Sequence, residues 1–130
     1  MKVFRYEHPN TGEGPYSIKV RDLCCGGVYE CENCNEWYDL RSEFTNKHNN
    51  SITHPGWYQD FGASYDNPGM FSGFVSREQA YEWFDGFVED LERFGFQLLC
   101  FEVPKKHVEI GLSGRQLRFK KDQAAKKERE

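Results

Sequence analysis

The amino-acid sequence predicts an α+β domain with a small antiparallel or mixed sheet and one main amphipathic helix. Three observations support this fold class: an alternating apolar segment near the N-terminus, helical apolar spacing over residues 76–94, and short strand patterns on both sides of that helix. The chain has 130 residues, which fits one domain. We therefore expect a single domain over residues 1–119 and a charged tail over residues 120–130.

The first predicted strand lies close to the N-terminus. Phe4 and Tyr6 alternate there with Val3 and Arg5. We therefore expect the two pairs on opposite faces of a sheet. Proline and glycine residues then predict a rigid loop over residues 8–16.

The clearest element is a helix that follows a short buried strand at residues 70–75. Ser76 and Gln79 have the spacing of a capping box at its N-terminus, and Gly95 is placed to end it. Helical spacing predicts one continuous apolar face formed by Ala80, Trp83, Phe84, Phe87, Val88, Leu91 and Phe94. Further strands are predicted over residues 97–103, 107–110 and 115–119.

The formal net charge is −4, but the charges are unevenly distributed. Residues 1–114 are acidic, whereas residues 115–130 hold 7 Lys+Arg and 3 Asp+Glu. An acidic body argues against binding to duplex nucleic acid, which needs clustered cations. We interpret the basic tail as a solvated or frayed helical end, with contact to an acidic partner as the alternative.

The chain contains no run of eighteen apolar residues and opens without the features of a signal peptide. We therefore expect it in the cytoplasm, away from membranes, where a reducing environment disfavours disulfides. The five cysteines then raise the question of metal binding or simple burial.

A cysteine-bearing insertion is predicted over residues of about 20–60. Its Cys31-x-x-Cys34 spacing is typical of a zinc knuckle, and zinc would stabilise an otherwise loop-rich region. The candidate ligand set is Cys24, Cys31, Cys34 and His48, with Cys25 and His54 as the alternative third and fourth ligands. Two other interpretations stay open, namely reduced cysteines packed as small apolar residues and a redox-active pair.

The predicted helix also carries acidic residues opposite its apolar face. They follow helical spacing, with Asp90 beside the row formed by Glu78, Glu82, Asp85, Glu89 and Glu92. A solvated face is one interpretation of this row. The other is a contact surface for a basic protein partner.

Several segments outside the cysteine-bearing stretch resemble a family of small proteins encoded in bacteriophage and prophage genomes. The segments are Val3 to His8, Gly12 to Tyr16, His54-Pro55-Gly56 with Asp60, Phe74-Val75-Ser76 through Trp83-Phe84 to Gly95-Phe96, and Gly114 to Phe119. The resemblance covers both ends of the chain. It implies a phage accessory protein that acts in the cytoplasm of the bacterial host.

The order of elements is also similar to the ADP-ribosyltransferase fold. Arginine-class members carry an Arg on the first strand, a Ser at the end of a middle strand and a Glu that opens a late strand. Arg5 and Ser76 match the first two places, whereas Gln116 stands where the Glu is expected. Glu102 and Glu109 are the alternative carboxylates, although their positions fit the pattern less well. The resemblance therefore implies Arg5, Ser76 and Gln116 as the catalytic set.

This resemblance implies a cleft that binds a nucleotide such as NAD or a host protein, for host takeover or against host defence. Arg5 would hold phosphate, and Tyr16 and His54 would complete the cofactor-binding set. The first alternative is an active mono-ADP-ribosyltransferase. The second is a non-catalytic inhibitor that binds a protein through the acidic helix face. Each residue also has a plainer interpretation: an ion pair with Glu7 or another acid at the surface for Arg5, a helix cap for Ser76, and a solvent-facing strand position for Gln116.

Overall fold

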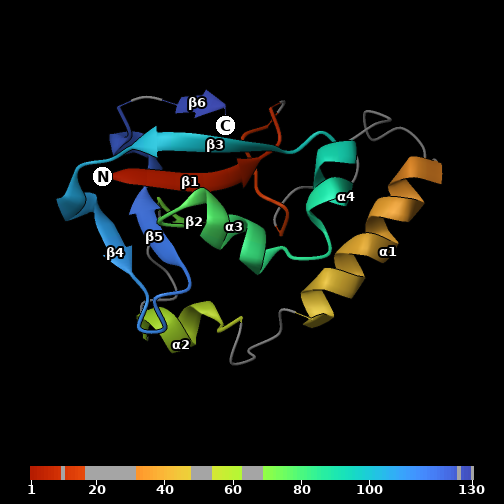
Figure 1. Cartoon of the computed structure of the whole chain (residues 1–130), viewed down its shortest axis with the longest axis horizontal. Coiled ribbons are helices and arrows are strands. Elements are labelled where there is room, and N and C mark those ends of the chain that lie inside the picture. Colours follow the sequence, from red (N-terminus) through yellow and green to blue (C-terminus); the bar gives the residue numbers. More distant parts are fainter. Residues whose placement is uncertain (10, 17–31, 48–53, 63–68, 126, 130) are drawn as a thin grey trace.

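Antiparallel strands form the centre of the described chain (Figure 1). The computed structural model describes residues 1–9, 11–16, 32–47, 54–62, 69–125 and 127–129. Strand β1 (Lys2–Glu7) pairs with β3 (Gln97–Glu102), whose other edge pairs with β6 (Lys127–Arg129). The second sheet has the order β2 (Met70–Gly73), β5 (Leu117–Lys120), β4 (Val108–Ile110). The prediction of an α+β fold with small antiparallel sheets is confirmed.

The two sheets meet where β1 runs beside the end of β2. Phe4 and Phe74 exchange two backbone hydrogen bonds of 2.9 and 2.8 Å. Gly73 permits this approach, because a Cβ there would lie 2.7 Å from Val3 Cγ1 and 3.1 Å from the carbonyl oxygen of Phe4.

The alternation predicted for β1 is confirmed by its two faces. Tyr6, with Phe4 packed alongside, belongs to the core under the helices, whereas Val3 belongs to a second core between the sheets. The first core contains Tyr6, Trp37, Leu40, Phe74, Ala80, Trp83, Phe84, Phe87, Leu91, Phe96 and Leu98. The second contains Val3, Leu99, Phe101, Val103, Leu117 and Phe119. Strand β1 is therefore covered on both faces.

The prediction of one continuous helix over residues 76–94 is wrong. The segment forms two helices, α3 (Arg77–Trp83) and α4 (Val88–Arg93), separated by a turn in which Gly86 has a φ of +87°. The turn keeps the apolar residues on the side of the core, so their spacing alone did not reveal the break. The capping prediction is confirmed, since Gln79 N donates to Ser76 Oγ at 3.0 Å.

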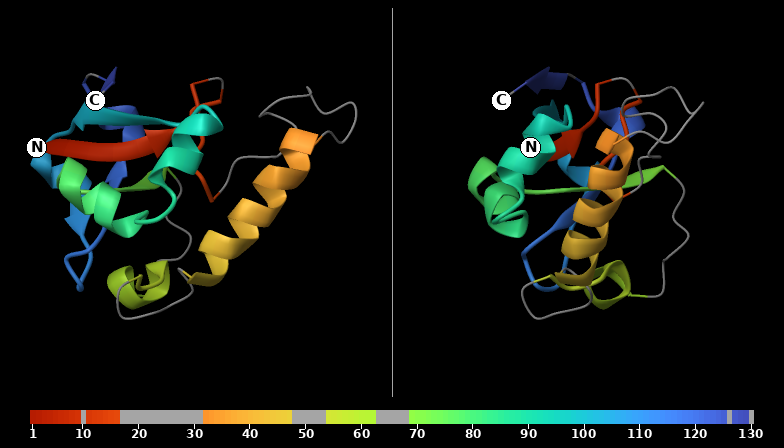
Figure 2. Two further views of the ribbon diagram at one scale, coloured as in Figure 1. Left: turned by 45° about the vertical axis from the view of Figure 1, so that its right-hand side comes forward. Right: turned by 90° about the vertical axis from the view of Figure 1, so that its right-hand side faces the viewer.

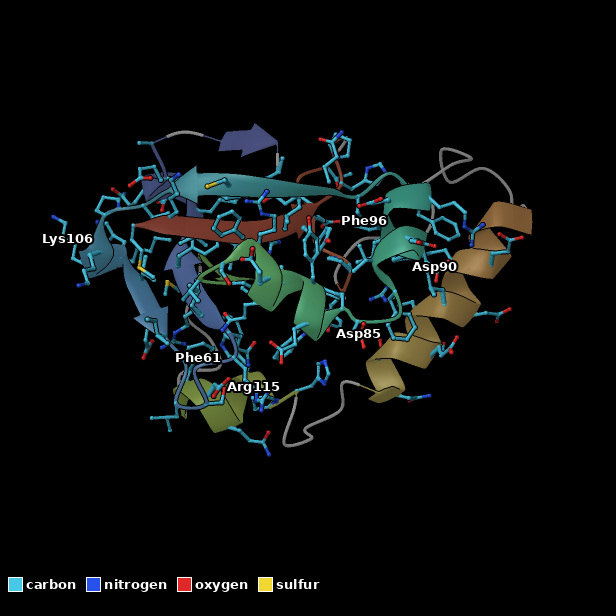
Figure 3. All side chains as sticks on the ribbon, viewed as in Figure 1. Phe61, Asp85, Asp90, Phe96, Lys106 and Arg115 are labelled. Carbon is cyan, nitrogen blue, oxygen red and sulfur yellow. The ribbon has the colours of Figure 1, made fainter. Side chains whose placement is uncertain are left out.

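The break also divides the acidic row between α3, the turn and α4. Arg93 supplies counter-charge, with Nη1 lying 2.8 Å from Glu36 Oε2 and Nη2 lying 3.8 Å from Asp90 Oδ1. Figure 3 shows Asp90 on α4, on the side where the long helix α1 (Glu32–Lys47) passes. The row is therefore not a single uninterrupted stripe.

The middle of the chain contains two helices where an irregular region was predicted. The helix α1 lies on the α4 side of the molecule, outside the sheets (Figure 2), and α2 (Trp57–Phe61) lies below β5. The buried Trp37 holds α1 in place by stacking on Phe96, with ring centroids 5.2 Å apart. In the part of the chain that the structure describes, no helix has the length and apolar character needed to span a bilayer.

The basic tail returns to the first sheet instead of forming a helical end. A 3-10 turn at Lys121–Gln123 follows β5, and the backbone N–H of Ala125 then donates to the carbonyl oxygen of Glu102 at 2.8 Å. Strand β6 continues this contact, with Lys127 opposite Phe101. The tail prediction was wrong because strand pairing with β3 is a long-range contact that the local composition does not indicate.

Candidate functional site

A cavity of about 440 Å³ opens beside the end of β1. Its walls come from β1, the loop before residue 17, the segment leading into α2, strand β2, the end of α3 and the residue before β5. Aromatic side chains dominate the described lining: Tyr6, Tyr16, Trp57, Phe71, Phe74, Trp83 and Phe84. Arg5, Ser72 and Gln116 add polar side chains. An apolar cavity of this size with a few convergent polar groups is typical of a small-molecule site.

Arg5 is the cation of the described lining, and it is almost fully buried. Its Nε donates to Glu7 Oε1 at 3.1 Å, and its Nη1 donates to the carbonyl oxygen of Ser72 at 2.9 Å. Gly14 lies against the remaining Nη2 atom, since a Cβ there would be 3.1 Å away from it. Burial lowers the pKa of Arg5, while the charge and hydrogen bond of Glu7 act in the opposite direction. The guanidinium still stays protonated at neutral pH.

The Glu7 carboxylate is shared between two cations. Lys121 Nζ lies 2.6 Å from the same Oε1 atom that accepts from Arg5. The three groups together carry a net charge of +1. The ion pair of Arg5 with Glu7 is present, although it is buried and not at the surface as expected, and Lys121 adds one positive charge beside it.

Tyr16 and His54 are connected through Trp83. The indole Nε1 of Trp83 donates to the Tyr16 hydroxyl at 2.8 Å, and His54 Nε2 lies 2.6 Å from the Trp83 carbonyl oxygen. A carbonyl oxygen only accepts, so His54 Nε2 is the donor. Burial raises the pKa of Tyr16, against the opposite effect of the Trp83 hydrogen bond. Tyr16 lines the cavity, whereas His54 supports its wall from behind Trp83.

Gln116 is held at the cavity wall by two acceptors. Its Nε2 donates to the carbonyl oxygen of Pro55 at 2.8 Å and to Asp60 Oδ2 at 2.8 Å. The buried Asp60 carboxylate also accepts from Ser113, from the backbone N at 2.8 Å and from Oγ at 3.0 Å. These contacts connect α2 to the loop before β5, where Figure 3 shows Phe61 and Arg115. The interpretation of Gln116 as a solvent-facing residue is therefore wrong.

Gly111 permits the close packing of Asp60. A Cβ at this position would lie 2.6 Å from Asp60 Cγ and 2.8 Å from Oδ2. A side chain at position 111 would overlap the Asp60 carboxyl group, which is buried and cannot move away. The loop therefore needs glycine at this position to pack against Asp60.

The structure brings Arg5, Tyr16 and Gln116 together around one cavity and leaves Ser76 out of the described lining. Ser76 caps α3, which is its plainer interpretation, and Ser72 occupies the place beside Arg5. No sequence pattern indicates Ser72, because its contact with Arg5 follows from the approach of β1 to the end of β2.

The alternative carboxylates lie elsewhere on the sheets. Glu102 pairs with the N-terminal amine at 3.1 Å, and Glu109 accepts from Arg118 Nε at 2.5 Å. Neither residue belongs to the described cavity lining, and that lining contains no Asp or Glu. Asp60 contacts the cavity through Gln116, to which it is hydrogen-bonded, and the site predicted from the sequence did not include it.

The predicted zinc ligands fall almost entirely outside the described residues. Cys24, Cys25, Cys31 and His48 are not described, and Cys34 is described only as a backbone position in α1. Within the described segments, no group of three His, Cys, Asp or Glu side chains could hold a metal ion. The zinc site stays a prediction, and Cys100 is buried within β3.

Comparisons with known proteins place the chain in one family. No curated protein matches it, and no solved structure does. A family model described as the bacteriophage T4 Y00F protein matches residues 1–130, which is the whole chain. The predicted resemblance to small phage proteins is thereby confirmed: the chain belongs to the bacteriophage T4 Y00F protein family.

Proposed function

We propose that this phage protein binds a nucleotide, such as NAD or one of its halves, in the cavity beside β1. The observation that carries the proposal is the buried guanidinium of Arg5 at the wall of an aromatic-lined cavity of about 440 Å³. Arginine N–H groups donate to phosphate oxygens, and aromatic rings stack with nucleobases. The cavity provides both an arginine and aromatic rings.

The charge at the cavity favours an anion. Arg5, Glu7 and Lys121 carry a net charge of +1, and Phe71 lies under the two cations, with its ring centroid 5.2 Å from Arg5 Cζ and 5.3 Å from Lys121 Nζ. In a partly buried site this charge acts with little screening. A phosphate at Arg5 would leave the nucleobase and ribose among the aromatic side chains.

Binding is a better proposal than group transfer. The ADP-ribosyltransferase pattern suggests Arg5 on the first strand and a late-strand residue in one cleft, and Arg5 and Gln116 do line one cavity. A transferase would also need a carboxylate that stabilises the oxocarbenium-like transition state. An amide at position 116 cannot supply that charge. The proposed role in infection is to sequester or sense a nucleotide during host takeover or against host defence.

Thermal unfolding with added nucleotide tests the proposal. At a ligand concentration of 100 times Kd, binding stabilises the folded state by about 2.7 kcal/mol, a rise in Tm of roughly 10 °C for a domain of this size. Tyr16→Ala should weaken binding by about tenfold through lost stacking. Tyr81→Ala is the matched control, since Tyr81 is 40% exposed, Tyr16 is 38% exposed, and Tyr81 is not part of the described lining.

A second measurement separates binding from catalysis. With NAD as the substrate we expect no nicotinamide release above that of buffer. Release that falls in Glu102→Ala or Glu109→Ala would establish the transferase instead. Saturating NAD, AMP and nicotinamide mononucleotide that all leave the Tm unchanged would overturn the proposed nucleotide site.

A further inference from the structure

The orientation of the Gln116 amide is fixed by chemistry as well as by position. Both of its neighbours, the Pro55 carbonyl and the Asp60 carboxylate, can only accept hydrogen bonds. The amide must therefore direct its NH₂ group at them. A flipped amide would place Oε1 against two acceptors, which is unfavourable on both sides.

Asp60 cannot turn away to accommodate a flipped amide. Its Oδ1 accepts from Ser113 N, and its Oδ2 accepts from Ser113 Oγ as well as from Gln116. The side chain is buried, and Gly111 packs against its carboxyl carbon. The two hydrogens of Gln116 Nε2 are thus both used, and Oε1 is the polar atom that Gln116 can present to the cavity it lines.

We infer that Gln116 Oε1 is a specificity-determining acceptor for the ligand's base. This inference rests on the proposed function. It selects bases that carry an N–H donor on an exocyclic group, such as the amino group of adenine or the carboxamide of nicotinamide. A base with an oxygen at that place would set two acceptors against each other, which is unfavourable.

Two ligand pairs test the inference on the unmodified protein. AMP and IMP differ at the exocyclic group of the purine, which is an amine in AMP and a carbonyl in IMP. Nicotinamide mononucleotide and nicotinic acid mononucleotide differ in the same sense, with a carboxamide against a carboxylate. We expect the N–H-bearing member of at least one pair to bind about tenfold more tightly or better, measured by calorimetry.

Variants then assign the preference to Gln116. Gln116→Met keeps the length of the side chain but removes Oε1, so the ratio within the preferred pair should fall to about threefold or less. Ser113→Ala is the matched control, because it removes one hydrogen bond to Asp60 and leaves the amide of Gln116 held by Pro55 and Asp60. The preference should survive in this control.

The outcomes separate the two proposals. Equal binding of both members in each pair overturns the inference and leaves the nucleotide site standing. A preference that persists unchanged in Gln116→Met also overturns it. Failure of all four nucleotides to bind overturns the proposed function and this inference together.

Discussion

Replacing Gln116 by glutamate places a second acid beside Asp60. In the native protein, Gln116 Nε2 donates to Asp60 Oδ2 and to the Pro55 carbonyl, each at 2.8 Å. Gln116→Glu removes both donors and brings two carboxyl groups within about 3 Å, a distance at which like charges repel by several kcal/mol at the effective dielectric of a protein. The folded state should respond by keeping the introduced carboxyl protonated.

The expected loss of stability depends on pH. At about pH 4.5 the introduced carboxyl is largely protonated in the folded state and can donate to Asp60, so the main loss is the bond to Pro55, about 1–2 kcal/mol. Burial beside Asp60 raises the pKa of the introduced carboxyl above that of an unfolded glutamate, about 4.3. The folded state then binds more protons than the unfolded state. Stability therefore falls as pH rises from about 4.3, to a total loss of about 3–5 kcal/mol at pH 8.

Urea unfolding followed by tryptophan fluorescence measures this loss, because Trp57 and Trp83 line the cavity. Each value is the difference from the native protein at the same pH, so titration common to both proteins cancels. Gln116→Met is the control that removes the donor without adding a titratable group, with a loss of about 2–3 kcal/mol at pH 8. The double variant Asp60→Asn with Gln116→Glu restores a donor–acceptor pair and should lose less than the sum of the two single changes. Equal losses at pH 4.5 and pH 8 for Gln116→Glu would refute the proposed contact.

Three further predictions follow from other contacts. Gly73→Ala should destabilise the fold by about 2–3 kcal/mol in urea unfolding, because the new Cβ would overlap Val3, and a change below 0.5 kcal/mol would contradict the close approach of the sheets. Tyr6→Phe should be neutral or stabilise by up to about 1 kcal/mol, because the buried Tyr6 hydroxyl has no partner among the described residues. Burial raises the pKa of Tyr6, so the native protein should lose stability as pH rises above about 10 and Tyr6→Phe should lose less. The zinc prediction implies about one zinc per chain by elemental analysis, lost in Cys31→Ser, and a zinc content near zero would assign the cysteines to packing.

Local patterns predicted most of the strands, because the order of apolar and polar residues within a strand indicates which of its faces is buried. The alternation of Phe4 and Tyr6 with Val3 placed both faces of β1 correctly. Strand β3 was predicted from a continuous apolar run, and its four central residues are buried. The cap at Ser76 was predictable for a similar reason, since its contact with Gln79 spans three residues.

Elements that depend on distant partners were not predictable in the same way. The helix α1 shows little amphipathic pattern, and Trp37 holds it against Phe96, about sixty residues away in the sequence. The break between α3 and α4 preserves the phase of the apolar residues, so only Gly86 marked it. Strand β6 forms by pairing with β3. The charged composition of the tail does not indicate a strand.

The site shows the same division between local and distant information. Arg5, Tyr16 and Gln116 were predicted as candidates, and they line one cavity. The sequence pattern predicts Ser76 for the site, whereas Ser72 contacts Arg5, and this contact depends on how the two sheets meet. Asp60 is predicted only as part of the segments that resemble the phage family. Its partner Gln116 lies 56 residues further along the chain, which no local spacing can indicate.

The contact of Gln116 with Asp60 also limits which side chains fit at position 116. A carboxylate at position 116 needs donors around it, whereas the fold provides the Pro55 carbonyl and the Asp60 carboxylate, which are both acceptors. Asp60 in turn is needed to hold the loop at Ser113 against α2. The packing that shapes the cavity wall therefore requires a donor at position 116.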